Sequence, residues 1–172
     1  MNLDNRIELP DGRALAYAEF GQSDGLPVVY CHGSPGSRLE PLLIGDEVLT
    51  RAGLRVISPD RPGMGGSDFQ PGRRIPDWPA DLVCLADSLG LARFAMLGNS
   101  GGRMPITLFH GEADTNAPIA MARRAAAALP SATLITYPGE AHLSTLCNHF
   151  DEIARALAAP PVRIDTAGRQ TR

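Results

Sequence analysis

A serine within a glycine-rich turn is the first residue of this sequence whose setting suggests chemistry. Ser100 is the third residue of Gly98-Asn99-Ser100-Gly101-Gly102, which fits the pattern G-x-S-x-G and follows the apolar run 94–97. In this pattern the serine lies on a sharp turn between a strand and a helix, where its hydroxyl can reach a substrate. The glycines permit close backbone contacts that a Cβ would block. Such a pentapeptide is a weak signal by itself, so its surroundings decide its meaning.

Asp114 and His142 could activate this serine. A serine hydroxyl is a poor nucleophile at neutral pH, so it needs a base to take its proton, and that base needs a third group to orient it. Asp114 follows the apolar run 106–110, and His142 follows the run 133–137, so each is predicted to lie in a loop after a strand. The predicted roles are nucleophile for Ser100, orienting acid for Asp114 and general base for His142.

Each of these residues also has a non-catalytic interpretation. Asp114 could be a turn or cap residue, and His142 could be a solvated or core histidine. Two further histidines are assigned to structure, because His110 ends a predicted strand and His149 lies on a predicted amphipathic helix. Taken together, in order and each behind a predicted strand, the three candidates favour catalysis.

Acyl transfer also requires two hydrogen-bond donors for the oxyanion of the tetrahedral intermediate. The N–H of Gly101, which directly follows the candidate nucleophile, is one predicted donor. The other is predicted to be the N–H of Ser34, in the glycine- and proline-rich loop 32–36 that follows the apolar run 27–31.

Alternating strands and helices are predicted to position these loops. Short runs at 7–9 and 14–20 flank a Pro-Asp-Gly turn and predict a β-hairpin. Apolar runs and helical spacing predict the remaining elements: strands at 27–31, 54–58, 94–97, 106–110 and 133–137, and helices at 37–52, 77–90, 118–129 and 146–157. A capping box, Ser37-Arg38-Leu39-Glu40, marks the expected start of the first of these helices, and Gly45 is a position at which that helix could be broken.

This order of elements predicts an α/β fold, with a mainly parallel sheet and helices on both of its faces. Ligands bind at the carboxyl ends of strands in such sheets, so the candidate residues are expected to meet at one edge. The length of 172 residues favours a single domain, predicted over 1–158. Residues 159–172 have little to bury and are predicted to form a disordered tail.

Composition narrows the class of function. A net charge of −3 offers no electrostatic argument for binding nucleic acid or an anionic membrane. The first five residues lack the basic and apolar regions of a signal peptide, and no apolar run reaches membrane-spanning length. Cys31, Cys84 and Cys147 are odd in number and widely spaced, which predicts buried free thiols in a reducing compartment, with no disulfide or metal site. We therefore expect a cytoplasmic protein.

Five motifs in this order resemble the α/β-hydrolase superfamily, and the resemblance covers roughly residues 6–158. The motifs are an oxyanion loop at 32–38, a D-x-P/R-G-x-G-x-S segment at 60–68, a nucleophile elbow at 98–102, an acid loop at 111–118 and a histidine loop at 139–142. The resemblance implies hydrolysis of a carboxylic ester or related acyl bond through an acyl-enzyme. It implies a small-molecule acyl substrate and no metal or organic cofactor. Serine at position 100 separates the chain from relatives resembling haloalkane dehalogenases and epoxide hydrolases, which use aspartate there.

The sequence departs from the family after the elbow, where a long helix, a further strand and usually a helical cap are missing. Residues 98–105 join two predicted strands directly, whereas a parallel crossover needs about a dozen residues or more. A hairpin is the simple alternative, and it would place Asp114 about 15–20 Å from Ser100. Alternatively, the strand at 94–97 gives up its place, or residues 99–105 stretch across the sheet edge and the other strands stay parallel.

Two functions therefore stay open. The chain is predicted to be a compact, capless serine hydrolase. The alternative is a catalytically impaired or inactive, internally deleted α/β-hydrolase with at most a binding role. The oligomeric state is left open.

Overall fold

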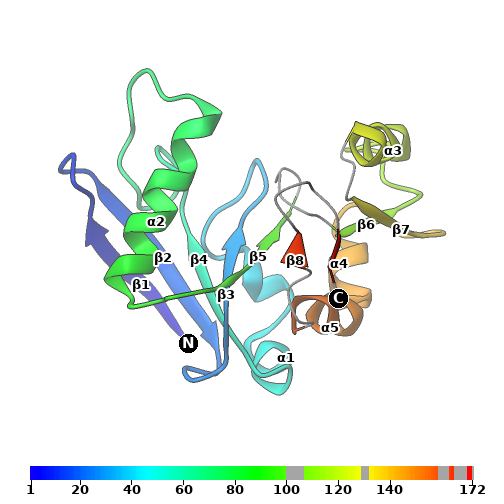
Figure 1. The fold of residues 1–172 in the computed structure, drawn as a ribbon, viewed down its shortest axis with the longest axis horizontal. Coiled ribbons are helices and arrows are strands. Elements are labelled where there is room, and N and C mark those ends of the chain that lie inside the picture. The colour runs from blue at the N-terminus through cyan, green and yellow to red at the C-terminus, as the bar shows by residue number, and fades with distance from the viewer. Residues whose placement is uncertain (100–106, 129–131, 159–162, 165–169, 172) are drawn as a thin grey trace.

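The chain forms a five-stranded sheet and a separate two-stranded sheet, with helices packed around them (Figure 1). The computed structural model describes residues 1–99, 107–128, 132–158, 163–164 and 170–171. The larger sheet has the order β1-β2-β4-β3-β5, with bounds Asn2–Glu8 (β1), Ala14–Gly21 (β2), Leu26–Cys31 (β3), Leu54–Pro59 (β4) and Ala95–Gly98 (β5). The smaller sheet pairs β6 (Thr107–Gly111) with β7 (Thr133–Tyr137).

Strand pairing brings two candidate loops to one edge of the larger sheet. The predicted hairpin forms, since β1 pairs antiparallel with β2, and β2 pairs antiparallel with β4. The middle of the sheet is parallel, as predicted, because β3 pairs in parallel with both β4 and β5. Cys31 at the end of β3 lies opposite Gly98 at the end of β5. The loop after β3 and the turn after β5 therefore leave the sheet side by side.

The expected hairpin between the strands at 94–97 and 106–110 is wrong. Among the described residues β5 pairs with β3, and β6 pairs in parallel with β7, and no pairing joins β5 to β6. The alternative in which 94–97 gives up its place is also wrong, because β5 keeps its position beside β3. The remaining alternative, a connection stretched across the sheet edge, concerns residues 100–106, which lie outside the described residues.

The helices follow the predicted order, with two breaks. Their bounds are Glu40–Leu43 (η1, a 3-10 helix), Asp46–Arg51 (α1), Ile75–Asp77 (η2, 3-10), Trp78–Ser88 (α2), Ile119–Ala128 (α3), Ser144–Asn148 (α4) and Phe150–Ala158 (α5). The helix expected at 37–52 starts later than predicted, at Glu40, and it is broken at Gly45, as the sequence allowed, where a left-handed φ of 95° separates η1 from α1. The helix expected at 146–157 is likewise divided in two, at His149.

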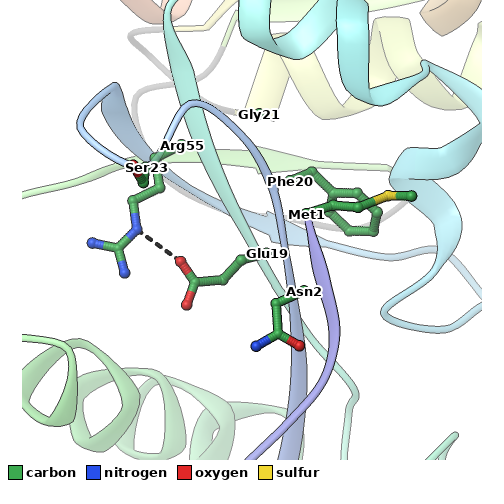
Figure 2. Close-up of a pocket in the computed structure, with 7 residues that line it drawn as sticks. All are labelled: Met1, Asn2, Glu19, Phe20, Gly21, Ser23 and Arg55. Atoms are coloured by element: carbon green, nitrogen blue, oxygen red, sulfur yellow. Dashed lines mark hydrogen bonds and ion pairs between the residues drawn. The ribbon is translucent and has the colours of Figure 1, made fainter.

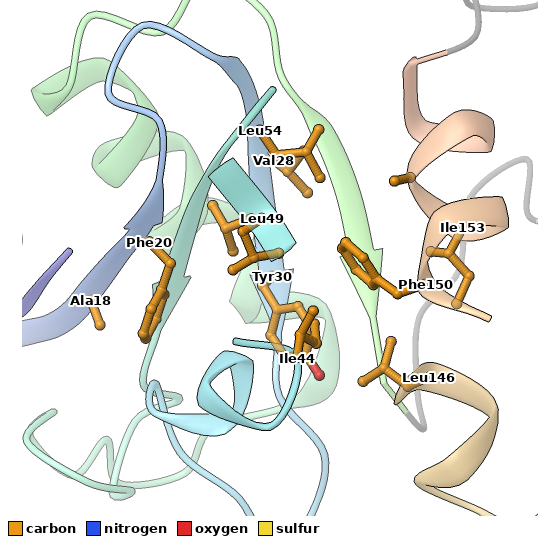
Figure 3. Packing of buried hydrophobic residues seen from close by; sticks show 12 residues of the cluster. Ala18, Phe20, Val28, Tyr30, Ile44, Leu49, Leu54, Leu146, Phe150 and Ile153 are labelled. Atoms are coloured by element: carbon orange, nitrogen blue, oxygen red, sulfur yellow. The ribbon is translucent and has the colours of Figure 1, made fainter. Parts of the chain in front are cut away.

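Two buried clusters, one on each face of the larger sheet, fasten the helices to it. One cluster joins Leu15, Ile57 and Leu85, so α2 covers that face. The other joins side chains of β2, β3, α1, α4 and α5, and Figure 3 shows Tyr30 of β3 opposite Leu146 and Phe150 of the last two helices. Because α4 follows β7 closely, this packing attaches the β6–β7 unit to the larger sheet without strand pairing. Helices on both faces are thus confirmed.

Three sequence expectations concern features outside this core. The predicted tail at 159–172 lies largely outside the described residues, which include a short antiparallel pair, β8 (Arg163–Ile164) with β9 (Gln170–Thr171). Its disorder and the domain boundary at 158 stay predictions. The three cysteines are free, but Cys31 and Cys84 are half-buried and Cys147 is exposed, so the expectation of buried thiols is wrong. In the part of the chain that the structure describes, every helix is too short or too polar to cross a membrane.

Candidate active site

The predicted acid and the predicted base lie in contact. Nδ1 of His142 is 2.7 Å from Oδ2 of Asp114. The two residues belong to loops that follow β6 and β7, which run parallel with Gly111 opposite Tyr137. Their carboxyl ends therefore point the same way, and the loops that follow them meet.

Backbone contacts hold these two loops against each other. The N–H of Glu112 donates to the carbonyl of Tyr137 at 3.0 Å, and the N–H of Ala113 donates to the carbonyl of Glu140 at 2.9 Å. Gly111 permits this approach, because a Cβ at that position would overlap the carbonyl oxygen of Glu140. Asp114 and His142 are thus positioned by main-chain bonds between their loops as well as by their own hydrogen bond.

The carboxylate of Asp114 is buried and satisfied on both oxygens. Oδ1 accepts the N–H groups of Asn116 and Ala117 at 2.8 and 2.9 Å, and Oδ2 accepts Nδ1 of His142. Burial opposes the charge, but the N–H of Ala117 and the ring of His142 outweigh it, so the pKa of Asp114 is lowered. An ionised Asp114 keeps a proton on Nδ1 of His142, which leaves Nε2 able to accept a proton. Asp114 serves both as a turn residue and as the partner of His142.

His110 lies near the end of β6, as expected from the sequence, whereas His149, expected on a helix, lies at the break between α4 and α5. Nε2 of His110 donates to the carbonyl of Ala117 at 2.8 Å, which closes the acid loop on itself. His149 stacks on the ring of Tyr137, with centroids 3.7 Å apart.

The nucleophile turn begins where the sequence places it. β5 ends at Gly98, and the N–H of Asn99 donates to the carbonyl of Cys31 at 3.0 Å. Ser100 and Gly101, the predicted nucleophile and one predicted oxyanion donor, lie outside the described residues. Ser34, the other predicted donor, is exposed in the loop after β3. The start of the serine turn and the loop of Ser34 therefore leave neighbouring strand ends.

A buried histidine that the sequence reasoning missed organises the loop of Ser34. Nε2 of His32 accepts the N–H of Arg61 at 3.1 Å, and its Nδ1 donates to the carbonyl of Gly33 at 2.8 Å. These partners require the neutral ring with the proton on Nδ1. Burial lowers the pKa of His32, although the nearby carbonyl of Gly33 acts in the opposite direction. The sequence held one signal for this role, because His32 directly follows the apolar run 27–31, which is typical of a strand buried on both faces.

We expect His32 to make the protein less stable in mild acid. Its folded pKa is lower than the ordinary value of about 6.5, so the unfolded chain binds the extra proton first. The contribution is present at neutral pH and is lost as pH falls below about 6.5, by at most about 1.4 kcal/mol per pH unit. Urea unfolding of wild type and His32→Gln between pH 8 and pH 5 checks this. The stability advantage of wild type should shrink with acid, and a difference independent of pH would contradict it.

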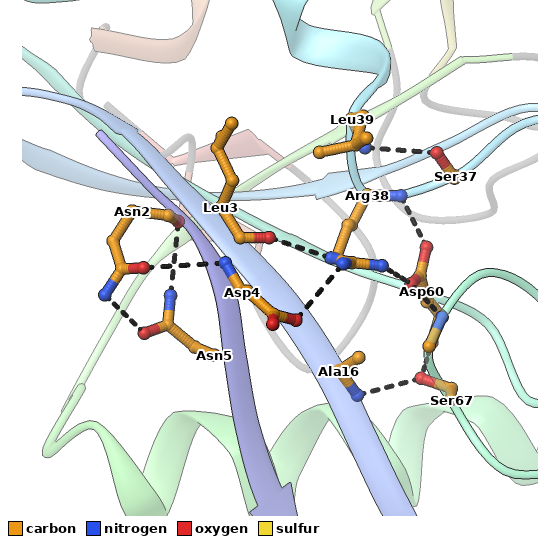
Figure 4. A network of polar contacts seen from close by, with 11 residues as sticks. Asn2, Leu3, Asp4, Asn5, Ala16, Ser37, Arg38, Leu39, Asp60 and Ser67 are labelled. Atoms are coloured by element: carbon orange, nitrogen blue, oxygen red, sulfur yellow. Dashed lines mark hydrogen bonds and ion pairs between the residues drawn. The ribbon is translucent and has the colours of Figure 1, made fainter.

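A buried ion pair joins the loop of Ser34 to the segment after β4 (Figure 4). Arg38 contacts Asp60 twice, through its N–H at 2.6 Å and its Nη1 at 2.7 Å. Asp60 also accepts the N–H of Gly66 at 2.8 Å, and Ser67 donates to its carbonyl at 2.9 Å. Removing one member would leave a buried charge without its partner, so we assign this network to structure.

A shallow pocket of about 240 Å³ lies away from these loops (Figure 2). It is lined by residues of β1, β2 and β4, and Arg55 in its wall pairs with Glu19 at 2.8 Å. Arg55 stands near the amino end of β4, whereas the candidate loops follow carboxyl ends of strands. The pocket is therefore distinct from the candidate site.

Comparisons with known proteins agree with this architecture. A family model described as alpha/beta hydrolase fold matches residues 27–102. A non-heme chloroperoxidase from Streptomyces lividans is 36% identical over 100 residues, which cover 56% of this chain and 35% of the chloroperoxidase. The chain spans about a third of the length of the curated relatives it matches.

Two solved structures share the fold along most of the chain. A CIB-like hydrolase from Thermoplasma acidophilum has a TM-score of 0.72 and 18% identity, covering 90% of this chain and 96% of that one. An esterase from Thermogutta terrifontis has a TM-score of 0.68 and 15% identity, with the same shares of 90% and 96%. At these identities the likeness concerns the fold alone, and it confirms the fold class expected from the sequence.

Proposed function

Because this chain has the α/β-hydrolase fold and resembles the α/β-hydrolase superfamily in sequence, we propose that it is a serine hydrolase of carboxylic esters or related acyl bonds. The contact of 2.7 Å between Asp114 and His142 is the observation that carries the proposal. It pairs an acid with a histidine whose second nitrogen can take a proton, which is the part of a triad that activates a serine.

The proposed reaction has two steps. Oγ of Ser100 attacks the acyl carbon while Nε2 of His142 takes its proton, and the alcohol leaves with that proton to give an acyl-serine. A water molecule, deprotonated by the same nitrogen, then attacks the acyl-serine and releases the acid. The N–H groups of Ser34 and Gly101 stabilise the oxyanion in both steps. The choice of Ser34 is supported by its neighbour, because the N–H of Gly33 already donates to Glu40 at 2.9 Å.

The proposed substrate is a small acyl ester, hydrolysed without a metal or organic cofactor. The names of the structural neighbours, a hydrolase and an esterase, agree with this reaction class. We also propose a cytoplasmic location, on the basis of the three free cysteines.

A second candidate is a non-catalytic descendant with a binding role. Two observations favour it. Among the described residues no strand pairing joins β5 to β6, and the chain covers 35% of the length of the chloroperoxidase. In this case the Asp114–His142 pair persists without a reactive serine.

A fluorophosphonate probe distinguishes the two candidates, because it reacts only with an activated serine. We expect the probe to label Ser100 alone, as read by peptide mass spectrometry, and Ser100→Ala to abolish labelling. His142→Ala should slow labelling by at least about 100-fold, since general-base catalysis contributes about 10²–10⁴. Ser23→Ala, at an exposed serine far from the loops, is the matched control and should label normally. A folded wild-type chain that does not label would support the second candidate.

A further inference from the structure

Glu40 joins three parts of the candidate site through one carboxylate. Its Oε1 accepts the hydroxyl of Tyr30 at 2.9 Å and the side-chain amide of Asn99, and its Oε2 accepts the N–H of Gly33 at 2.9 Å. Tyr30 lies near the end of β3 and Gly33 in the oxyanion loop. Asn99 is the residue directly before Ser100.

We infer that Glu40 is a positioning residue, which sets the distance between the oxyanion loop and the serine turn. The inference rests on the proposed function, because it assigns the two linked segments to the oxyanion donor and the nucleophile. Among the described residues the carboxylate of Glu40 accepts hydrogen bonds from Tyr30, Gly33 and Asn99. It acts through Gly33, which precedes Ser34, and through Asn99.

The core anchors this link. Tyr30 is fully buried in the cluster between β3 and the last two helices (Figure 3). Burial raises the pKa of Tyr30, and the neighbouring Glu40 raises it further, so its hydroxyl keeps its proton and donates. The oxyanion loop also wraps closely around the carboxylate, since a Cβ at Gly36 would lie 2.7 Å from Oε2. The carboxylate therefore has little freedom to move.

All three partners of Glu40 donate their hydrogen bonds to it. Ionised glutamate offers two oxygens that only accept, whereas glutamine replaces one oxygen by an NH₂ group of the same size. In Glu40→Gln that NH₂ must face either the N–H of Gly33 or the pair formed by Tyr30 and Asn99. The N–H of Gly33 cannot accept from that NH₂, and the hydroxyl of Tyr30 and the amide of Asn99 would have to turn from donors into acceptors, so the link is weakened with almost no change in volume.

The test compares Glu40→Gln with a matched control, Glu47→Gln, whose side chain is exposed on α1. It also includes Asn99→Ala and the double variant Glu40→Gln/Asn99→Ala. For hydrolysis of p-nitrophenyl acetate we expect Glu40→Gln to lower kcat about 10–30-fold, because small misplacements near a reacting centre are costly, and to leave KM unchanged. The kcat of the double variant should be no lower than that of the less active single variant, because both changes break the same link. Additive losses, or an unchanged kcat in folded Glu40→Gln, would overturn the inference.

A second readout separates this inference from the proposed function. If wild type neither hydrolyses the ester nor labels with the fluorophosphonate, the proposed function fails, and the link is judged by amide hydrogen exchange. The link predicts that the Gly33 amide exchanges about tenfold faster or more in Glu40→Ala, which removes both acceptor oxygens, than in the control Glu47→Ala. Equal exchange in the two variants would show that Glu40 does not hold the loop.

Discussion

Replacement of Asp114 by asparagine is expected to lower kcat by about 10³–10⁴-fold in a folded protein, the size of the loss when the acid of a triad becomes an amide. Asparagine can keep an oxygen for the N–H groups of Asn116 and Ala117, but it then turns its NH₂ toward His142. Nδ1 of His142 must accept that hydrogen bond, so the ring proton moves to Nε2. The histidine then holds the wrong tautomer for a base.

Steady-state hydrolysis of p-nitrophenyl acetate and thermal unfolding measure this effect together. Glu112→Gln is the matched control, because Glu112 is an exposed carboxylate in the same loop and its change should leave kcat unaltered. Both variants remove one negative charge from the loop after β6, so the comparison isolates the effect of the contact between Asp114 and His142. A loss of less than about tenfold in folded Asp114→Asn would show that Asp114 does not orient the base.

The substitution Gly111→Ala, which adds one methyl group, is expected to lower kcat by about 100-fold or more and to destabilise the protein by about 1–3 kcal/mol. The new Cβ would overlap the carbonyl of Glu140 and lie 2.6 Å from Oγ1 of Thr145. The overlapping atom belongs to the backbone, so the histidine loop must move away. That movement breaks the bond of 2.9 Å between Ala113 and Glu140 and separates Asp114 from His142.

Gly90→Ala serves as the control for stability. Gly90 has a left-handed φ of 65° and no atom within 4 Å of an added Cβ, so alanine there costs about 1–2 kcal/mol of strain without touching the site. Urea unfolding should show a loss in both variants, whereas ester hydrolysis should fall only in Gly111→Ala. Full activity in folded Gly111→Ala would mean that the packing of the two loops does not set the distance between acid and base.

Most elements of this fold could be predicted from the sequence. The apolar runs at 27–31 and 54–58 became β3 and β4, and the helical spacing after Asp77 became α2. A strand buried on both faces or a helix with one apolar face can be recognised without knowledge of its neighbours, because burial imposes a local pattern. The same patterns placed Asp114 and His142 behind strands.

The role of Glu40 could not be predicted in this way. Ser37 and Glu40 match a capping box, so the local pattern favoured a helix start at 37. In the folded chain Glu40 instead binds Gly33 and Asn99, and Asn99 is 59 residues away in the sequence. Local spacing cannot encode a partner so distant, and the tertiary contacts override it. His32 was missed for the same reason, since Arg61 reaches it from another loop.

The sequence by itself determined the order of strands and helices and the positions of Asp114 and His142 in loops after strands, because apolar spacing and loop position are local properties. Only the tertiary structure decided how the strands on either side of residues 98–105 are arranged, with β5 in the larger sheet and β6 in the smaller one. The short connection at 98–105 favoured a hairpin between the strands that it joins. Instead, α4 and α5 carry Leu146, Phe150 and Ile153 into the core of the larger sheet. Burial of these side chains attaches β6 and β7 without pairing them to β5. Such packing depends on surfaces that meet only after the chain has folded, as does the parallel pairing of β6 with β7 that brings Asp114 and His142 together.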